Sequence, residues 1–554
     1  MFEVRDDEAD VESIMARIRD TLNRKGANGG KSEEEVSIDA SQRATQRVGS
    51  RMVDHDLDRL RTLEMLDYFQ DPKPQGPIAA RHGLAMAAAK RLIRKIRGPY
   101  HRAIFARQAE FNTHLVRLME DLLLPLPSVP AASGGIPSNA RPRRPKLTVA
   151  VPYPVSPPLT GGQLRISSLC RSIARAFNVE LITLAGPRST LLEQEVTPGV
   201  TEVQVPKALR HQEEEDLIAE STRGVPIAGV AIPLLFRHSL LYLGYLSRSV
   251  RTADVVLASY PYCLPAIRKY LDTQPLIYNA HNVEYLLYKE LFSRSGCSRS
   301  DLLEIVWQTE AEACRSSALI LACSMEDKAN LCRIYSIEPS KVLVVPNGVD
   351  SQAVRFASFR ERDRAKAEFG LAGQQIALFV GSWHPPNLEA AESIFDMARG
   401  LPQVRFILAG GQCIPLGSRS RPRNVGLMGI VDDETLTALL AVADVALNPM
   451  TSGSGTNHKI AMYLAAGAPV ITTPHGARGY DLIDGEQALI CPAEEFPGRI
   501  AQMVHDRALA ERVARNGRRL VEERYDWSIN GEEVAHALVS LLERRTSDVG
   551  TSRS

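Results

Sequence analysis

The sequence predicts an α/β protein with two Rossmann-like, doubly wound domains that face a cleft, preceded by an N-terminal helical arm. The chain has 554 residues, more than one hydrophobic core usually organises. After residue 145, short apolar runs alternate with helical patterns, as in parallel strands joined by helices. A second series of the same kind begins at Ile376. Proteins of this kind bind small substrates in the cleft between the domains.

Composition excludes several classes of protein. Hydrophobic residues make up 44% of the chain and charged residues 24%, which is ordinary for a globular protein. The formal net charge is +1, so no overall field favours nucleic acid, and no nucleic-acid partner is expected. The eight cysteines form no C-x-x-C pair and are expected to be reduced thiols.

The sequence predicts a cytoplasmic location. The first ten residues are acidic where a secretory signal would be basic and then apolar. No stretch approaches the ~20 apolar residues that span a bilayer. The longest apolar candidate, residues 225–235, contains Pro226 and Pro233 and is followed by Arg237 and His238, so a buried or membrane-facing segment of a soluble domain is expected there.

Residues 1–125 form the predicted arm. Val11, Ile14 and Ile18 fall on one helical face, and strand patterns are lacking. A proline-rich hinge is expected over 126–145. Basic and apolar residues alternate over 90–97, a pattern suited to an anionic membrane surface at the cytoplasmic face of the inner membrane or to a partner protein. A solvated charged face is the alternative.

The two Rossmann-like domains are expected over 146–345 and 346–527, followed by a C-terminal helix and tail over 528–554. The expected strands are 147–153, 179–183, 255–259, 276–279 and 319–322 in the first domain, and 376–382, 404–408, 444–448 and 469–473 in the second. Ligand loops should lie at the carboxyl ends of these strands.

Several motifs resemble those of one enzyme family. Residues 345–350 (VPNGVD), 406–411 (FILAGG), 452–460 (SGSGTNHKI) and 465–473 (AAGAPVITT) are similar to the C-terminal half of retaining GT-B glycosyltransferases. Residues 158–165 (PLTGGQLR) and 278–284 (YNAHNVE) are similar to the N-terminal half. The resemblance, to the family 4-like and group 1 glycosyltransferases, implies a GT-B fold and a nucleotide-sugar-dependent hexosyltransferase. It also implies two partners, a nucleotide-sugar donor and a glycan or lipid-linked acceptor.

A nucleotide-sugar donor leaves as a diphosphate, so its site must stabilise negative charge. A helix N-terminus with exposed amides does this without metal. A loop of small residues before the helix expected near residue 457 fits that role, and Lys459 would add a positive charge. The loop residues are Gly453, Ser454, Gly455, Thr456 and Asn457. An ordinary strand-to-helix turn with a solvated lysine is the alternative.

Gly161 and Gly162 are expected on the opposite side of the donor. They follow the first strand, and Arg165 lies one turn into the next helix. Glycines in this position also serve tight turning. The resemblance implies that this loop closes over the diphosphate and sugar, with Arg165 supplying charge.

His281 ends an apolar strand where the resemblance places a histidine near the reacting centre. Its imidazole could hydrogen-bond the donor sugar or the attacking hydroxyl. The alternative is a structural histidine that caps the helix expected over 283–292. Asn282 and Glu284 share both interpretations.

The sequence departs from the family pattern in two places. Many members have two glutamates eight positions apart, for the donor sugar and the ribose, where this chain has Ser454 and Met462. A methionine is a poor acceptor for ribose hydroxyls. The usual arginine and lysine after the first strand of the second domain are replaced by the loop 381–387 (GSWHPPN), in which Gly381 and Ser382 are expected to contact the donor.

No metal and no cofactor are expected. Asp54, Asp56 and Asp58 have D-x-D spacing but lie in the predicted arm rather than after a strand. The predicted function is a retaining, metal-independent transfer onto a cell-surface polysaccharide or lipid-linked glycan precursor, such as that of lipopolysaccharide. Met462 and Ser454 motivate the alternative, a catalytically weakened GT-B protein that acts as a binding or scaffold subunit in glycan assembly.

Overall fold

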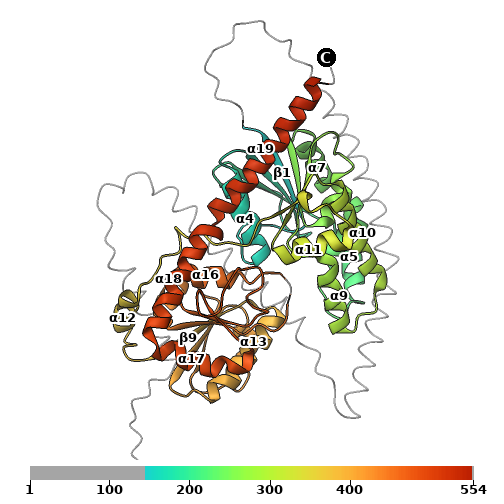
Figure 1. Cartoon of the computed structure of the whole chain (residues 1–554). Helices are drawn as coiled ribbons and strands as arrows, with labels where there is room; N and C mark the ends of the chain where they lie inside the picture. Colours follow the sequence, from blue (N-terminus) through green and yellow to red (C-terminus); the bar gives the residue numbers. More distant parts are fainter. Residues whose placement is uncertain (1–143, 454, 552–554) are drawn as a thin grey trace, which may run out of the picture. The chain divides into compact units, whose positions relative to one another are not determined.

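The computed structural model describes residues 144–453 and 455–551 of the chain. The predicted arm over 1–125, nearly all of the hinge, the basic run over 90–97 and the D-x-D aspartates lie outside these residues, as does Ser454. Element labels follow Figure 1.

The first domain is built on an eight-stranded sheet in the order β3-β4-β2-β1-β5-β6-β7-β8. Its strand pairs are parallel except the edge pair β3–β4, which is antiparallel. At the centre, Val149 is in register with Leu181 on one side and Leu257 on the other. The strands are β1 (Lys146–Val151), β2 (Asn178–Ala185), β3 (Leu192–Thr197), β4 (Val200–Pro206), β5 (Val255–Ser259), β6 (Leu276–Asn279), β7 (Leu319–Ala322) and β8 (Val342–Val344).

Helices cover both faces of this sheet. Alternate residues of β1 point to opposite sides, and both sides carry apolar residues that need to be buried. Leu147, Val149 and Val151 pack on one face and Ala150 on the other. The helices are α4 (Gly161–Ile173), α5 (Leu209–Ala219), α6 (Ala228–Leu235), η2 (Phe236–His238), α7 (Leu240–Arg251), η3 (Pro261–Cys263), α8 (Leu264–Ile267), α9 (Glu284–Ser295), α10 (Ser300–Ser316), α11 (Met325–Tyr335) and η4 (Pro339–Lys341).

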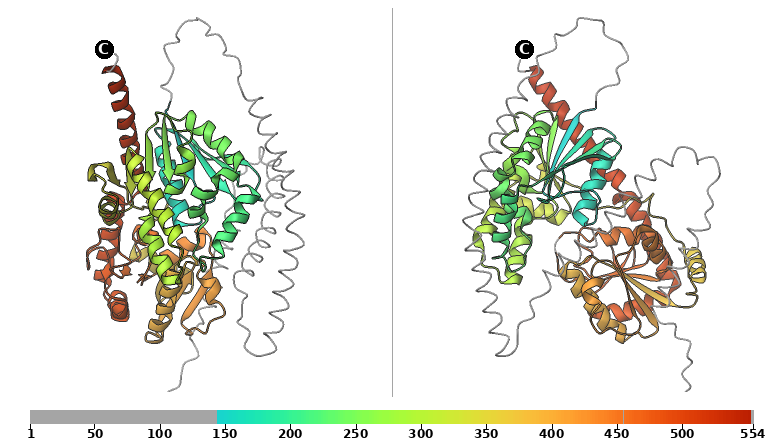
Figure 2. Two further views of the ribbon diagram at one scale, coloured as in Figure 1. Left: turned by 90° about the vertical axis from the view of Figure 1, so that its right-hand side faces the viewer. Right: turned by 180° about the vertical axis from the view of Figure 1, so that it is seen from behind.

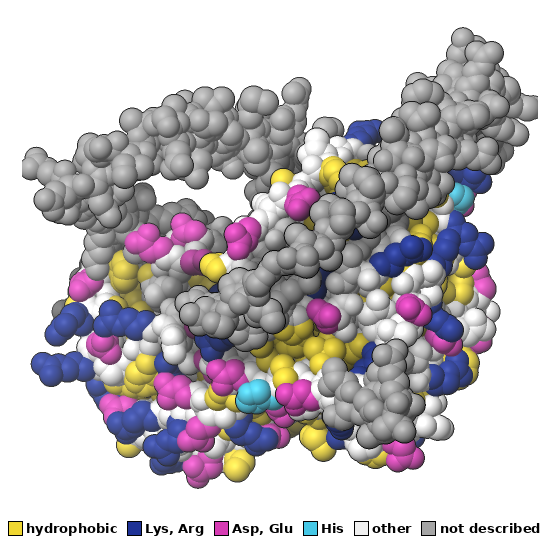
Figure 3. All heavy atoms as spheres, turned by 90° about the horizontal axis from the view of Figure 1, so that it is seen from above, with side chains coloured by type: hydrophobic (Ala, Val, Ile, Leu, Met, Phe, Trp, Pro, Cys, Tyr) yellow, Lys and Arg dark blue, Asp and Glu magenta, His cyan; other side chains and the backbone are white. Residues whose placement is uncertain are grey.

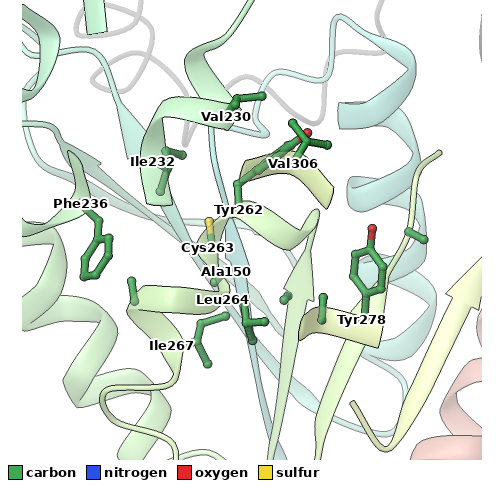
Figure 4. Close-up of a cluster of buried hydrophobic side chains, with 14 of the residues drawn as sticks. Ala150, Val230, Ile232, Phe236, Tyr262, Cys263, Leu264, Ile267, Tyr278 and Val306 are labelled. Atoms are coloured by element: carbon green, nitrogen blue, oxygen red, sulfur yellow. The ribbon is translucent and has the colours of Figure 1, made fainter. Parts of the chain in front are cut away.

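The larger core cluster of this domain joins the sheet to α6, η3, α8 and α10. Val230 and Ile232 of α6 and Val306 of α10 belong to it, together with Tyr262 of η3 (Figure 4). The segment 225–235, expected to be buried, is largely so: Val225, Ile227, Val230, Ala231, Ile232 and Leu235 are all in the core. Pro233 lies inside α6, and the chain turns soon after it.

In the described part of the chain, no single helix has both the length and the apolar composition of a membrane span. The segments Ala228–His238 and Leu240–Arg251 meet that test only as a pair, and they are bent by 93°. On the face shown in Figure 3, lysine and arginine side chains alternate with aspartate and glutamate.

The second domain is built on a six-stranded parallel sheet in the order β11-β10-β9-β12-β13-β14. Two apolar clusters lie on its two faces. The strands are β9 (Gln375–Val380), β10 (Val404–Ala409), β11 (Val425–Gly429), β12 (Val445–Asn448), β13 (Val470–Thr472) and β14 (Leu489–Ile490). The helices are α12 (Phe359–Glu368), α13 (Pro385–Arg399), α14 (Cys413–Leu416), α15 (Asp433–Val442), α16 (His458–Ala466), η5 (Ala493–Glu495), α17 (Phe496–His505) and α18 (Arg507–Arg524).

The last helix, α19 (Trp527–Thr551), returns to the first domain. Val534 and Leu538 are buried in the cluster formed by β1 and α4, and Arg175, which follows the C-cap of α4, pairs with Glu532. Figures 1 and 2 show α19 running beside α4. The helix expected over 528–554 is therefore part of the first domain's packing rather than a free tail, up to the last described side chains.

Candidate active site

The first element of the site is the N-terminus of α4, directly after β1. Thr160 caps the helix: its Oγ1 accepts from the Gln163 amide, and the Gln163 Oε1 accepts from the Thr160 amide at 2.9 Å. This capping box starts the helix at Gly161 and leaves early main-chain amides unpaired within the helix. Gly162 has no room for a side chain, because a Cβ there would lie 2.5 Å from the Tyr260 hydroxyl and 2.6 Å from the Tyr153 hydroxyl.

The second element is the N-terminus of α16, directly after β12. Gly453 and Gly455 have φ angles of +106° and +68°, in the region that favours glycine. Asn457 is the N-cap residue, and its Nδ2 donates to the Gly476 carbonyl. The residues 453–457, with Ser454 outside the described structure, are called the phosphate loop below.

These two helix starts come from different sheets and lie against each other. A Cβ on Gly161 would lie 2.9 Å from the imidazole of His458, the first residue of α16. A Cβ on Gly455 would lie 2.7 Å from Oδ1 of Asn282. Asn347 Nδ2 donates to Thr456 Oγ1 at 2.5 Å. The structure thus brings Gly161 and Gly162 together with the phosphate loop.

His281 lies beside these glycines. Its ring stacks on Tyr260, with centroids 4.0 Å apart, and its Nε2 lies 2.9 Å from Ser259 Oγ and 3.2 Å from Asn279 Nδ2. Burial holds its pKa well below the usual range, and the charges of Arg165 and His458 lower it further. The imidazole is therefore neutral. It does not cap α9, whose N-cap residue is Val283, so the capping alternative is excluded.

Arg165 is buried, with 1% of its surface exposed. Its guanidinium donates to Asn279 Oδ1, to the Val345 carbonyl at 2.8 Å and to Asn347 Oδ1 at 3.0 Å. Because Asn347 in turn donates to Thr456, the guanidinium is linked to the phosphate loop through one side chain. The charge that the resemblance implies at Arg165 is, in this structure, hydrogen-bonded to three oxygen acceptors.

Lys459 lies one residue into α16 and points back toward β9. Its Nζ donates to Asn387 Oδ1 at 2.6 Å and lies 4.5 Å from the centroid of the Phe379 ring. Within residues 144–453 and 455–551 it has no ion pair with a carboxylate. Desolvation lowers its pKa to about 7. A cation in this position is stabilised by an anion that binds beside it.

Gly381 and Ser382 follow β9, and Asn387, in the first turn of α13, connects Ser382 to Lys459. Asn387 Nδ2 donates to Ser382 Oγ at 3.1 Å, and a Cβ on Gly381 would lie 3.1 Å from Asn387. The loop also exposes Trp383, at 58% of its surface. Ser382 and Lys459 are therefore joined through Asn387 at the carboxyl end of β9, and Gly381 packs beside Asn387.

Two family models cover most of both domains. The model described as Glycosyltransferase Family 4 matches residues 159–353, and the one described as Glycosyl transferases group 1 matches residues 374–506. Both glycine-led helix starts fall inside these matches, in the expected order. The chain belongs to the GT-B glycosyltransferases.

Known proteins similar to this GT-B glycosyltransferase are distant. Glycogen synthase from Mycobacterium tuberculosis is 25% identical over 267 residues, which are 45% of this chain and 61% of that protein. The match to these first relatives thus spans about three fifths of their length. D-inositol 3-phosphate glycosyltransferase from Segniliparus rotundus is 25% identical over 73% of this chain and 91% of that protein.

Solved structures share the fold of this GT-B glycosyltransferase. Sucrose-phosphate synthase from Thermosynechococcus elongatus superposes with a TM-score of 0.59 at 16% identity, over 73% of this chain and all of that one. The Anabaena protein HepE in complex with UDP-glucose superposes with a TM-score of 0.51 at 16% identity, over 72% of this chain and all of that one. Both likenesses confirm the two-domain GT-B architecture.

Met462 is half-buried and packs against the apolar cluster around α15 and α16. Other side chains at the phosphate loop were not predicted from the sequence. Arg478 NH2 donates to the Gly453 carbonyl at 2.6 Å, and His475 Nε2 lies 3.1 Å from the same oxygen. Both residues follow β13, the strand next to β12. Their place after a strand, at the carboxyl edge of the sheet, could have identified them as candidate site residues from the sequence.

His458 was also missed, although it is the residue that faces Gly161. Desolvation, together with the charge of Arg165, lowers its pKa to about 4, so it is neutral at pH 7. Among the described residues, no group of three or more histidine, cysteine, aspartate and glutamate side chains could hold a metal ion.

Proposed function

We propose that this GT-B glycosyltransferase moves a hexose from a nucleotide-sugar donor to a cell-surface polysaccharide or lipid-linked glycan precursor. The observation that supports this best is the convergence of two glycine-led helix N-termini, from separate sheets, with a lysine that has no described carboxylate partner. One of the relatives is named a glycosyltransferase and another a glycogen synthase, and the similar HepE structure holds UDP-glucose.

The diphosphate of the donor is proposed to bind at the phosphate loop. Main-chain amides at the start of a helix point at the ligand, and the helix dipole adds partial positive charge. Lys459 supplies a full charge from the same helix, with Gly381 and Ser382 beside it. These groups stabilise the negative charge that grows on the leaving diphosphate, so the transfer needs no metal ion.

His281 is proposed to act as a hydrogen-bonding group rather than as a base. Its Nε2 is occupied by Ser259 and Asn279, and Nδ1 lies on the side of Gly162, 3.7 Å from the position of a Cβ there. Because its pKa is held well below the usual range, the ring takes up a proton poorly at pH 7. An Nδ1–H can still donate to a sugar oxygen. Retention of configuration is proposed from the resemblance to retaining GT-B enzymes.

The acceptor and the location are proposed on the same resemblance. A lipid-linked acceptor would place the enzyme at the cytoplasmic face of the inner membrane, with the arm over residues 1–125 as its contact to the membrane or to a partner protein. A chain that starts near residue 141 should then still bind the donor. If that shortened chain precipitates, the arm packs on the catalytic domains instead.

Turnover of radiolabelled nucleotide sugars, with lipid-extracted and polysaccharide acceptors and with EDTA present, tests the proposal. We expect label to move to an acceptor at the same rate with EDTA and with Mn²⁺. Activity that EDTA abolishes and Mn²⁺ restores would overturn the metal-independent mechanism. Tight donor binding without any transfer would favour the alternative of a scaffold subunit, which Met462 motivates.

A further inference from the structure

Helix α9, whose N-cap residue directly follows Asn282, is anchored by a buried carboxylate from another helix. Its N-cap residue, Val283, has no side chain that can accept from the first amides. Glu310 of α10 takes this role: its Oε1 accepts from the Glu284 amide and its Oε2 from the Tyr285 amide, both at 2.9 Å. An acceptor of this charge at a helix N-terminus satisfies amides that the helix leaves unpaired.

The carboxylate of Glu310 accepts two further hydrogen bonds. Glu310 also accepts from the Tyr278 hydroxyl at 2.9 Å and from the Tyr335 hydroxyl at 2.7 Å. Four donors on one fully buried carboxylate leave its position little freedom. The first turn of α9 is therefore held at a fixed place relative to the sheet.

The second buried carboxylate, Glu284, folds back from that first turn. It is 2% exposed, its Oε2 accepts from the Tyr262 hydroxyl at 2.7 Å, and its Oε1 accepts from Asn282 Nδ2 at 3.1 Å. An amide whose nitrogen is held by a carboxylate must present its oxygen elsewhere. Here Asn282 Oδ1 faces Gly455: it lies 2.7 Å from the position that a Cβ on that residue would take.

We propose that Glu284 is a positioning residue that fixes the Asn282 amide against Gly455 and so sets the approach of the phosphate loop to the first domain. The inference rests on the proposed function, because the loop is taken to bind the donor diphosphate. Glu284 itself lies behind Asn282 and acts through it. Asn282 is the only one of the two that reaches the second domain among the contacts described above.

The cost of this arrangement supports a role beyond folding. Burial and the neighbouring charge of Glu310 raise the pKa of Glu284 to about 7. Two buried carboxylates with no lysine or arginine among their hydrogen-bond donors are poor contributors to stability, and such groups cluster at functional sites. An apolar residue in place of Glu284 would remove this cost and lose only the hold on Asn282 and Tyr262.

The test compares Glu284→Gln, Glu284→Leu and Asn282→Ala in the full-length protein. A glutamine can still accept from Asn282 Nδ2 and can donate to the Tyr262 hydroxyl oxygen. We expect Glu284→Gln to keep the donor KM within about twofold, whereas Glu284→Leu raises it about tenfold and changes kcat much less. In the Asn282→Ala background, Glu284→Leu should add nothing further, because its effect passes through Asn282.

Glu215→Gln is the matched control. Glu215, on α5, is also a buried glutamate. Its carboxylate pairs with the ammonium group of Lys207 at 2.6 Å and contacts none of the site residues. It should lower the melting temperature and leave the donor KM unchanged. Equal losses in Glu284→Gln and Glu284→Leu, or fully additive effects in the double variant, would overturn the proposal.

A measurement without donor separates this inference from the proposed function. Hydrogen exchange of the main-chain amides at residues 455–458 should speed up in Glu284→Leu and in Asn282→Ala, but not in Glu215→Gln. If no nucleotide sugar binds the unaltered protein, the proposed function fails while the exchange result still decides the role of Glu284. Unchanged exchange in both site variants would overturn it. If Glu284→Leu does not fold, Asn282→Ala alone carries the same expectation.

Discussion

The two sides of the candidate site are built in different ways. On the N-terminal side, buried side chains form the surface: Arg165, Asn279 and His281 are each hydrogen-bonded to other buried groups. On the C-terminal side the main chain forms it, at Gly453 and Gly455, whose positive φ angles suit glycine. A side-chain network is rigid and intolerant of change, whereas a glycine loop offers amides to a ligand. We infer that the N-terminal side positions the side chains of the site, whereas the C-terminal side binds the donor.

Arg165→Met should have the largest effect, and the effect should be on stability. The change leaves three buried oxygen acceptors, on Asn279, Val345 and Asn347, without their charged donor. We expect the free energy of unfolding to fall by about 3 kcal/mol, measured by urea unfolding followed by tryptophan fluorescence. A variant of unchanged stability that had lost donor binding would instead assign this charge to the donor.

Lys459→Met should weaken donor binding rather than stability, the opposite of Arg165→Met. Removing a desolvated charge with no described carboxylate partner costs little stability, but it removes a charged hydrogen bond to the diphosphate. We expect donor binding to weaken by about 2 kcal/mol, measured by isothermal titration.

Lys366→Met is the matched control for that change. Lys366 is in the same domain and is buried, but its Nζ pairs with Asp444 at 2.7 Å, away from the site. This variant should lose stability, because Asp444 loses its partner, and keep its donor affinity. If the two lysine variants behaved alike, the distinction between the two sides would not hold.

The same contrast explains what the sequence could predict. Strands 255–259, 276–279 and 319–322 were predicted with the bounds of β5, β6 and β7, because buried parallel strands are continuous apolar runs. The strands β8, β11 and β14 were missed because they are short, and the edge pair β3–β4 because polar residues interrupt its apolar ones. The phosphate loop could be predicted because its residues are consecutive.

The N-terminal side could not be predicted in the same way. The acceptors of Arg165 are 114 to 182 residues away along the chain, and their convergence depends on the order of strands in the sheet. For this reason the sequence indicated a charge at Arg165 but not the buried acceptors that hold it. His458 and Asn347 were missed for a similar reason, because their partners Gly161 and Arg165 lie in a different part of the sequence.

Met462→Glu sharpens the comparison on the C-terminal side. In related enzymes a carboxylate at this position binds the nucleotide ribose, whereas Met462 packs on the cluster around α16. If the donor binds in the family's usual position, glutamate should tighten donor binding by about 1.5 kcal/mol in a titration. Weaker binding would mean that this part of the pocket is built for an apolar group, and would favour an altered donor or the scaffold alternative.

The effect of pH on donor binding is the smallest predicted effect when the pH changes by one unit. Lys459 has a pKa of about 7, and a bound diphosphate favours its charged form. Donor affinity should therefore be constant below pH 7 and fall by up to about tenfold per unit above it. His281 and His458 have pKa values below this window, so they do not contribute.

The stability of the fold changes with pH in the opposite direction to the donor affinity. The pKa of Lys459 is lower in the folded protein than in the unfolded chain, so above pH 7 the unfolded chain holds the extra proton and stability rises with pH. Lys459→Met should flatten both profiles. A wild-type donor affinity that is level from pH 6 to pH 9 would contradict the assignment of Lys459 to the diphosphate.

The central claim is that the main chain of the phosphate loop and Lys459 bind a donor diphosphate without a metal ion. The most direct test is the melting temperature of the full chain, in EDTA, with UDP-, GDP-, ADP- and TDP-linked sugars, because a ligand that binds only the folded state raises it. We predict that at least one of these sugars raises the melting temperature of the unaltered protein and of Lys366→Met, and has little effect on Lys459→Met. No increase with any of them, or an increase that requires Mn²⁺, would contradict the account.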